Sequence, residues 1–261
     1  MAAIALYIAV FVAWNLAISL AIVGLPAAAA IPVVLALSAL VVFGFVLGGP
    51  RPARRRALVR LRPIPRRTQA WVLISAPVVL FFVQALSEVW VRLVPVPPDT
   101  FDPFGPLMRT TGGRVSITVL ALLVAPVMEE FFFRGLIQHA LERRWGVWAA
   151  VAATALLFAL GHGLPRVLPL HFFLGLAFGY AVYVTRSIWA GIFLHFVNNA
   201  AAMIETGPPA AVPTIWRTGP DPAWWASLGW LLVAAVVLLF TARGLRAAAR
   251  GRALRPAGAV G

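Results

Sequence analysis

Apolar residues in this chain form long, nearly unbroken stretches that are separated by short polar connections. They do not alternate as in a half-buried strand, and they do not follow the spacing of an amphipathic helix. Each stretch is close to the length that crosses about 30 Å of hydrocarbon at 1.5 Å per helical residue. The pattern predicts an all-α, polytopic integral membrane protein with about eight transmembrane helices. The stretches cover residues 3–23, 26–47, 70–94, 114–138, 147–162, 167–185, 187–205 and 223–242.

The composition excludes a soluble globular protein. Hydrophobic residues make up 62% of the chain and charged residues 11%, whereas soluble domains contain roughly 25% charged residues. Cysteine is absent from the sequence, which removes disulfides, thiol nucleophiles and thiolate metal ligands. No basic segment precedes the first apolar stretch, so we expect a retained first span and not a cleaved signal peptide.

The basic residues are all arginine, and most lie in connections between the apolar stretches. They gather between residues 51 and 67, at Arg143 and Arg144, at Arg186, and after residue 242. With eight spans, all these places share one side with both termini, which the positive-inside rule makes cytoplasmic. The net charge of +14 is therefore interpreted as an orientation signal and not as a nucleic-acid surface, because no aromatic-interleaved basic face accompanies it.

The chain reads as one transmembrane domain over residues 1–245, followed by a basic, flexible tail at 246–261. Two pairs of glycines four residues apart, Gly44 with Gly48 and Gly175 with Gly179, predict close approach of helix backbones. No internal repeat is visible, so the inverted-repeat architecture of many transporters has no support.

Two acids and one base lie inside the fourth stretch, at Glu129, Glu130 and Arg134. A single charged residue at a helix centre costs about 2.5 to 3.5 kcal/mol on insertion scales, so a functional role is the default reading. Glu130 and Arg134 are four residues apart and can pair on one helix face. Glu129 points about 100° away and can take a proton from water. The alternative is a buried ion-pair cluster that fixes helix register, which leaves Glu129 without a basic partner in its own helix.

Further polar residues occur at the end of the fifth stretch, at His162, and within the seventh, at His195 and Asn199. His195 and Asn199 share one helix face and could direct two hydrogen-bond donors at a single developing oxyanion. Asn198 lies off that face. His139 and His171 lie near the ends of spans and are interpreted as interfacial or packing residues.

These residues form three motifs on three hydrophobic stretches between residues 115 and 205. In this order the motifs resemble those of the CAAX protease and bacteriocin-processing (CPBP, or Abi) family of intramembrane endopeptidases, which includes the type II CAAX prenyl endopeptidases. The motifs are Glu129-Glu130-x-x-x-Arg134, Phe158-x-x-x-His162 and His195-x-x-x-Asn199. The resemblance implies an all-helical membrane fold and a peptidase activity.

The resemblance also implies roles for the matched residues. Glu129 would be the base that activates water, supported by Glu130 and Arg134, and His162 would join Glu129 at the water. His195 and Asn199 would stabilise the tetrahedral intermediate.

A metal requirement is left open by the sequence. Members of the family have been described both as metal-dependent and as metal-free glutamate peptidases. If a divalent metal such as zinc is bound, Glu129, His162 and His195 are the ligands that the motifs offer.

The function expected from the sequence is intramembrane hydrolysis of membrane-associated or lipophilic peptides, such as leaders or protein C-termini, in contact with membrane lipid. The expected location is a bacterial inner (plasma) membrane with both termini cytoplasmic, and nucleic acid is not an expected partner. The chain has no His-Glu-x-x-His or Gly-x-Ser-x-Gly motif, and Asp99, Asp102 and Asp221 all fall in loops, so metalloprotease motifs of that type and serine or aspartyl chemistry are disfavoured.

Two other classes of function fit the buried polar residues. The first is an ion-coupled transporter, in which buried acids and histidines relay protons or bind ions. The second is a non-catalytic immunity or membrane-assembly factor that keeps the motifs for folding.

Overall fold

All regular elements in the described part of the chain are helical, as the apolar pattern predicts. The computed structural model describes residues 2–25, 27–48, 59–94, 109–205 and 224–250. Asp99, Asp102 and Asp221 lie outside these residues, as does the predicted tail beyond residue 250. The elements are α1 (Ala2–Gly24), α2 (Ala27–Gly48), α4 (Arg66–Leu93), α6 (Thr111–Val119), η2 (Leu120–Val124), α7 (Ala125–Glu130), η3 (Phe131–Gln138), α8 (His139–Trp145), α9 (Val147–Gly161), η4 (Pro165–Val167), α10 (Leu168–Thr185), α11 (Ile188–Glu205) and α12 (Trp224–Arg250).

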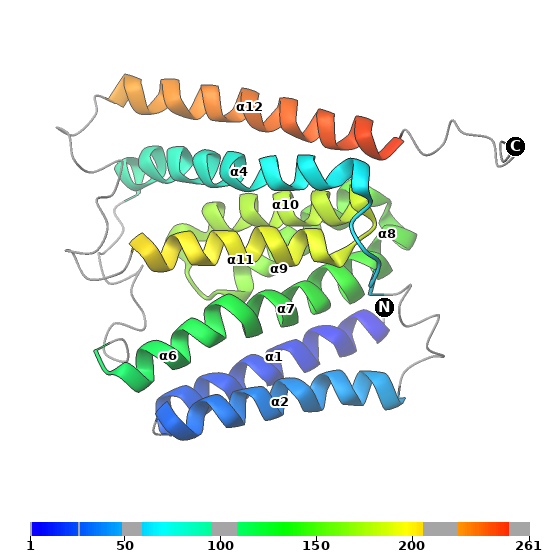
Figure 1. Cartoon of the computed structure of the whole chain (residues 1–261), viewed down its shortest axis with the longest axis vertical. Coiled ribbons are helices and arrows are strands. Elements are labelled where there is room, and N and C mark those ends of the chain that lie inside the picture. Colours follow the sequence, from blue (N-terminus) through cyan, green and yellow to red (C-terminus); the bar gives the residue numbers. More distant parts are fainter. Residues whose placement is uncertain (1, 26, 49–58, 95–108, 206–223, 251–261) are drawn as a thin grey trace, which may run out of the picture.

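The elements form eight helical rods, one for each predicted apolar stretch, because η2, α7, η3 and α8 continue α6 without a break. Four rods are long and apolar enough to cross a membrane: Arg66–Leu93, Thr111–Trp145, Pro165–Thr185 and Trp224–Arg250. The other four contain shorter apolar segments of 10–17 residues. Successive rods run in opposite directions, so α1 begins and α12 ends at the same end of the bundle (Figure 1).

The rod Thr111–Trp145 contains two π-helical segments on either side of the paired glutamates. In η2 the N–H of Ala125 donates to the carbonyl of Leu120, five residues back. The next residue, Pro126, has no N–H to donate to the carbonyl of Ala121. The wider turns therefore leave the Ala121 carbonyl without its helical partner just ahead of Glu129, and such π segments often occur at functional sites.

Close packing around α10 depends on small residues, as the sequence predicts for Gly175 and Gly179. A Cβ atom at Gly175 would lie 2.8 Å from the Cα of Ala155 in α9, and one at Gly179 would lie 2.8 Å from Oε1 of Gln138 in η3. The prediction is wrong for Gly44, where a Cβ would meet nothing within 4 Å. Gly44 is exposed on α2, so no helix in the described part of the chain packs against it.

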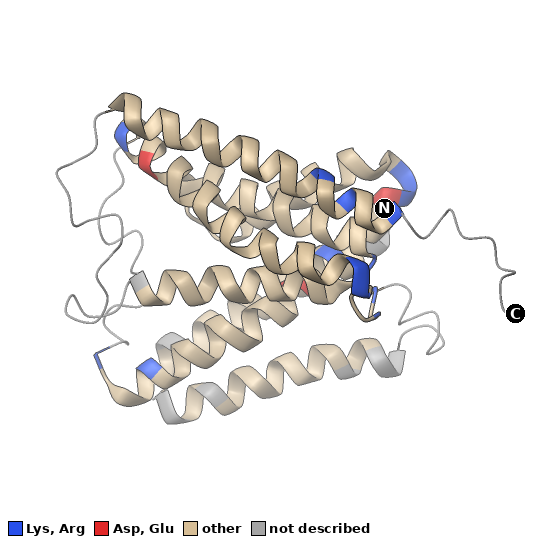
Figure 2. Cartoon of the chain, turned by 45° about the horizontal axis from the view of Figure 1, so that its top comes forward, with Lys and Arg blue, Asp and Glu red and all other residues tan. Residues whose placement is uncertain are grey.

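Basic residues gather at one end of the bundle (Figure 2). This end contains the start of α4 and the ends of α8, α10 and α12 (Figure 1), and α12 continues through Arg246 to Arg250. The opposite end has fewer arginines, among them Arg92 in the last turn of α4.

We expect the substitution Gly175→Ala to destabilise the bundle, because its Cβ would overlap the backbone of α9. Overpacking of this kind costs about 1–3 kcal/mol. The matched control is Gly44→Ala, which gains the same helix propensity without a clash and should leave stability unchanged or slightly raised. Thermal unfolding of the two variants in detergent measures the difference, and equal midpoints would contradict the packing role of Gly175.

Candidate active site

The Glu130 carboxylate is the centre of a buried polar cluster between the rod Thr111–Trp145 and α11. Its Oε1 atom accepts a hydrogen bond from Nη1 of Arg134 at 2.8 Å and lies 3.2 Å from Nδ1 of His195. Glu130 and Arg134 are both fully buried, and His195 is nearly so. The predicted ion pair is therefore present. Because an unpaired buried charge is strongly destabilising, the two partners are what permits a carboxylate at this position.

The Arg134 guanidinium is enclosed on several sides. Its Nη2 donates to the carbonyl of Gly175 at 3.1 Å, and its Cζ lies 4.5 Å from the ring centre of Phe158 and 5.5 Å from that of Phe178. Cation–π contacts of this kind partly replace the water that the cation has lost. One turn later Gln138 donates to the carbonyl of Gly179 at 3.1 Å. Because α10 comes close at Gly175 and Gly179, the side chains of Arg134 and Gln138 each reach a backbone carbonyl of α10.

His195 is oriented by Glu130 and by an aromatic face. Its ring is stacked on Phe178 with centroids 5.1 Å apart and an interplanar angle of 24°. An ionised carboxylate only accepts hydrogen bonds, so Nδ1 carries the proton that Glu130 binds and Nε2 is available for another partner. Gly191, one turn earlier in α11, makes this possible, because a Cβ there would collide with Oε2 of Glu130. Gly191 is not among the site residues predicted from the sequence, where its one signal is its position four residues before His195.

Glu129 faces a different direction and has no ion-pair partner of its own in the described structure. The Oε2 atom of Glu129 is buried and has no hydrogen-bond partner among the described residues. Its carboxylate interacts electrostatically with four ionisable side chains, which are His195, Glu130, Arg134 and His171. A buried carboxylate oxygen without a donor can accept a proton or a hydrogen bond from a molecule that enters the site.

His162 and His171 lie face to face beside this cluster. Their ring centres are 4.1 Å apart with a 35° tilt. Nδ1 of His162 lies 2.8 Å from the carbonyl of Phe158, and Nδ1 of His171 lies 3.2 Å from that of Val167. Since a carbonyl can only accept, both Nδ1 atoms carry protons and both Nε2 atoms are left as acceptors.

His171, interpreted from the sequence as a packing or interfacial residue, packs against the ring of His162. The turn between α9 and α10 brings the two together, and it includes Gly163 at a φ of 66°, a conformation that favours glycine. The spacing rules for residues within one helix do not apply across such a turn, so the sequence could not predict the contact between His162 and His171.

Asn199 joins α11 to the rod Thr111–Trp145. Its Nδ2 donates to the carbonyl of Ala121 at 2.9 Å, the carbonyl that Pro126 leaves without a helical partner. Its Oδ1 accepts from Nδ2 of Asn198 at 3.2 Å. His195 and Asn199 each contact an atom of the rod Thr111–Trp145, through Nδ1 and through one Nδ2 proton. That both direct a further donor at one oxyanion stays a prediction.

His139 is not part of the cluster. Its charged neighbours are Arg60, Glu142, Arg143 and Arg186, at the arginine-rich end of the bundle. The expectation that it is not a site residue stays an expectation.

The alternative of a bound metal receives no support from the arrangement of ligands. Among the residues that the structure describes, no group of three or more histidine, aspartate or glutamate side chains lies close enough together to hold a metal ion. Glu129, His162 and His195 thus do not form a preassembled zinc site with the three ligands such a centre needs.

Comparison with known proteins identifies the segment that carries the cluster. Residues 111–201 match the family described as type II CAAX prenyl endopeptidase Rce1-like, so the resemblance inferred from the three motifs is confirmed. The chain is also 28% identical over 86 residues to a Bacillus subtilis (strain 168) protein named "Putative membrane peptidase YdiL". That match covers 33% of this chain and 35% of the relative, about a third of each. No solved structure matches the chain significantly.

The pairing of Glu130 with Arg134 predicts a non-additive response to substitution. Arg134→Met leaves a buried carboxylate with one partner fewer and should lower the free energy of unfolding by about 3–5 kcal/mol. Adding Glu130→Gln removes the stranded charge, so the double variant should lose less than the sum of the single losses. Denaturant unfolding in detergent measures the cycle, with the exposed Arg144→Met as the control. Strictly additive losses would contradict the coupling.

Proposed function

Since residues 111–201 form an Rce1-like type II CAAX prenyl endopeptidase domain, we propose that this membrane protein hydrolyses peptide bonds of membrane-associated or lipophilic peptides within the bilayer. The observation that carries the proposal is the Glu129 carboxylate, which forms no ion pair with the described residues and whose buried Oε2 has no hydrogen-bond partner among them. It lies within electrostatic range of two histidines from separate helices, His171 in α10 and His195 in α11. A base for water and groups that orient water are the parts that metal-free hydrolysis requires.

In the proposed reaction Glu129 takes one proton from a water molecule while the water oxygen attacks the carbonyl carbon of the scissile peptide bond. The Nε2 atoms of His162 and His171 share the second proton of this water as hydrogen-bond acceptors and so orient the molecule. Glu129 then gives its proton to the peptide nitrogen as the C–N bond breaks. The products are a carboxyl terminus and an amino terminus, and the enzyme returns to its starting protonation state.

The tetrahedral intermediate carries a negative oxygen that needs donors. His195, held at Nδ1 by Glu130, would present Nε2 to the oxyanion and would donate from it when that nitrogen carries a proton. Nδ2 of Asn199 carries two protons. One donates to the carbonyl of Ala121, and the second would donate a hydrogen bond to the oxyanion. The Glu130–Arg134 pair keeps His195 in place and does not touch the substrate.

We further propose that all eight rods cross the membrane and that the arginine-rich end lies in the cytoplasm of a bacterium. The antiparallel order of the rods and the gathering of arginine at one end support this orientation (Figures 1 and 2). Both termini would then be cytoplasmic.

The substitution Glu129→Gln should reduce peptide cleavage at least about 100-fold, the lower range for loss of a general base. The assay is cleavage of a peptide library by the detergent-purified protein, read by mass spectrometry with and without a chelator. The control is Glu88→Gln, which removes a partly buried carboxylate from α4. Ion flux through reconstituted protein without any cleavage would instead support the transporter alternative.

His171→Gln should lower the rate of cleavage about tenfold, the equivalent of losing one hydrogen bond of about 1.4 kcal/mol to the attacking water. His162→Gln should have at least this effect, because Nε2 of His162 accepts a hydrogen bond from the same attacking water. His139→Gln is the matched control, since it removes a histidine from the rod Thr111–Trp145 at the arginine-rich end, outside the cluster. Equal rates for the His171 and His139 variants would remove His171 from the proposed mechanism.

A further inference from the structure

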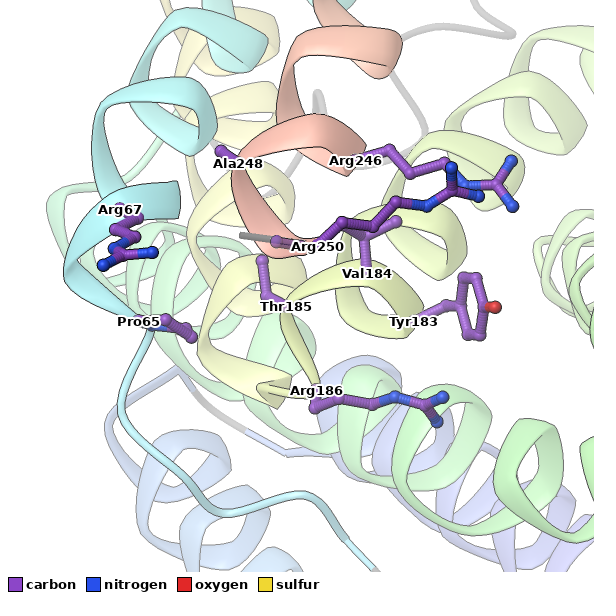
Figure 3. Close-up of a pocket in the computed structure, with 10 residues that line it drawn as sticks. Pro65, Arg67, Tyr183, Val184, Thr185, Arg186, Arg246, Ala248 and Arg250 are labelled. Atoms are coloured by element: carbon purple, nitrogen blue, oxygen red, sulfur yellow. The ribbon is translucent and has the colours of Figure 1, made fainter. Parts of the chain in front are cut away.

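A pocket of about 320 Å³ lies at the arginine-rich end of the bundle, away from the Glu130 cluster. It is formed by the start of α4 and the ends of α10 and α12. Four arginines line it, together with Tyr183 (Figure 3). In Figure 3 the guanidinium groups of Arg186, Arg246 and Arg250 extend toward the same side as the Tyr183 ring, whereas Arg67 lies apart from them at the start of α4.

Positive charge in this pocket exceeds what the protein itself neutralises. Arg246 and Arg250 form no ion pair with any described residue. Arg186 lies 3.8 Å from Glu142, but that carboxylate is already paired with Arg60. The carboxyl ends of α10 and α12 each contribute only about half a negative charge. An anion from outside the chain would neutralise the remaining positive charge of the pocket.

Aromatic residues beside the pocket place it at the level of lipid headgroups. Trp148 is stacked on Tyr180 with ring centres 6.0 Å apart, and Arg246 lies 5.9 Å from the Trp148 ring. Tryptophan and tyrosine gather at membrane–water interfaces because their rings have an apolar body and a polar group. The hydroxyl of Tyr180 donates to the carbonyl of Ala242 in α12, so this aromatic edge is joined to the helix that carries Arg246.

An apolar surface leads away from the pocket along α12. Leu239 and Phe240 are 61% and 70% exposed and lie two to three turns before Arg246 and Arg250. A ligand with a phosphate at one end and hydrocarbon chains at the other could therefore contact both surfaces together. A free phosphate ion would use only the arginines.

We propose that this pocket binds the phosphate of an anionic phospholipid, with Arg186, Arg246 and Arg250 as its ligands. Guanidinium groups match phosphate oxygens with paired hydrogen bonds, and basic pockets between transmembrane helices bind anionic headgroups. The acyl chains lie along α12. This binding does not depend on the proposed peptidase activity.

Binding of phosphatidylglycerol to the detergent-purified full chain tests the proposal, with native mass spectrometry as the readout. The wild type should retain phosphatidylglycerol in preference to phosphatidylcholine. The double variant Arg246→Gln with Arg250→Gln should bind it about 25-fold more weakly, about fivefold for each arginine near an anionic headgroup. Arg246→Lys with Arg250→Lys should fall between the two, since lysine keeps the charge but loses the paired hydrogen bonds.

The control is Arg143→Gln with Arg144→Gln, which removes the same charge from the exposed end of α8 outside the pocket. Its affinity should equal that of the wild type. A loss as large as that of the pocket variant would overturn the proposal, because it would reflect net charge alone. Equal binding of both lipids by the wild type, or displacement of the lipid by millimolar inorganic phosphate, would also overturn it.

Discussion

A carboxylate that is buried in an apolar bundle is stable only with cationic or hydrogen-bonding partners. At Glu130 these partners join the helices at the centre of the protein. One partner, Arg134, comes from the next turn of the same rod, and the other, His195, comes from α11. Removing either would strand a charge where water does not reach it. The cluster therefore links the rotation of α11 to that of the rod Thr111–Trp145, and only a narrow range of helix orientations satisfies it.

Small residues and altered helix geometry make this arrangement sterically possible. Gly191 leaves room for Oε2 of Glu130, and Gly175 lets α10 come close enough for its carbonyl to accept from Arg134. Pro126 and the π turn at η2 free the carbonyl of Ala121, which Asn199 then binds. Each of these features would weaken an isolated helix, and each is used here to join two helices.

The candidate chemistry lies beside the ion pair and not within it. Oε1 of Glu130 contacts Arg134 and His195, whereas Glu129 forms no ion pair among the described residues. Oε2 of each glutamate is buried and has no hydrogen-bond partner among those residues. His162 and His171 are fixed by backbone carbonyls in the tautomer that leaves Nε2 as an acceptor. Helix geometry points the two adjacent glutamates in different directions, and the proposed mechanism therefore gives Glu130 a structural role and Glu129 the proton transfer.

Spacing within a single helix determined much of this protein from the sequence alone. Long apolar stretches predicted the helical rods, and the four-residue separation of Glu130 and Arg134 predicted their pair. Both follow from the fixed rise and rotation per residue, which need no tertiary information.

Relations between helices were decided by the tertiary structure. The pairing of His171 with His162, the partner of Asn199, the need for Gly191 and the convergence of Arg186 with Arg246 depend on how far each helix is rotated and shifted against its neighbours. That rotation is set by side-chain packing summed over many contacts, and no local pattern in the sequence encodes it.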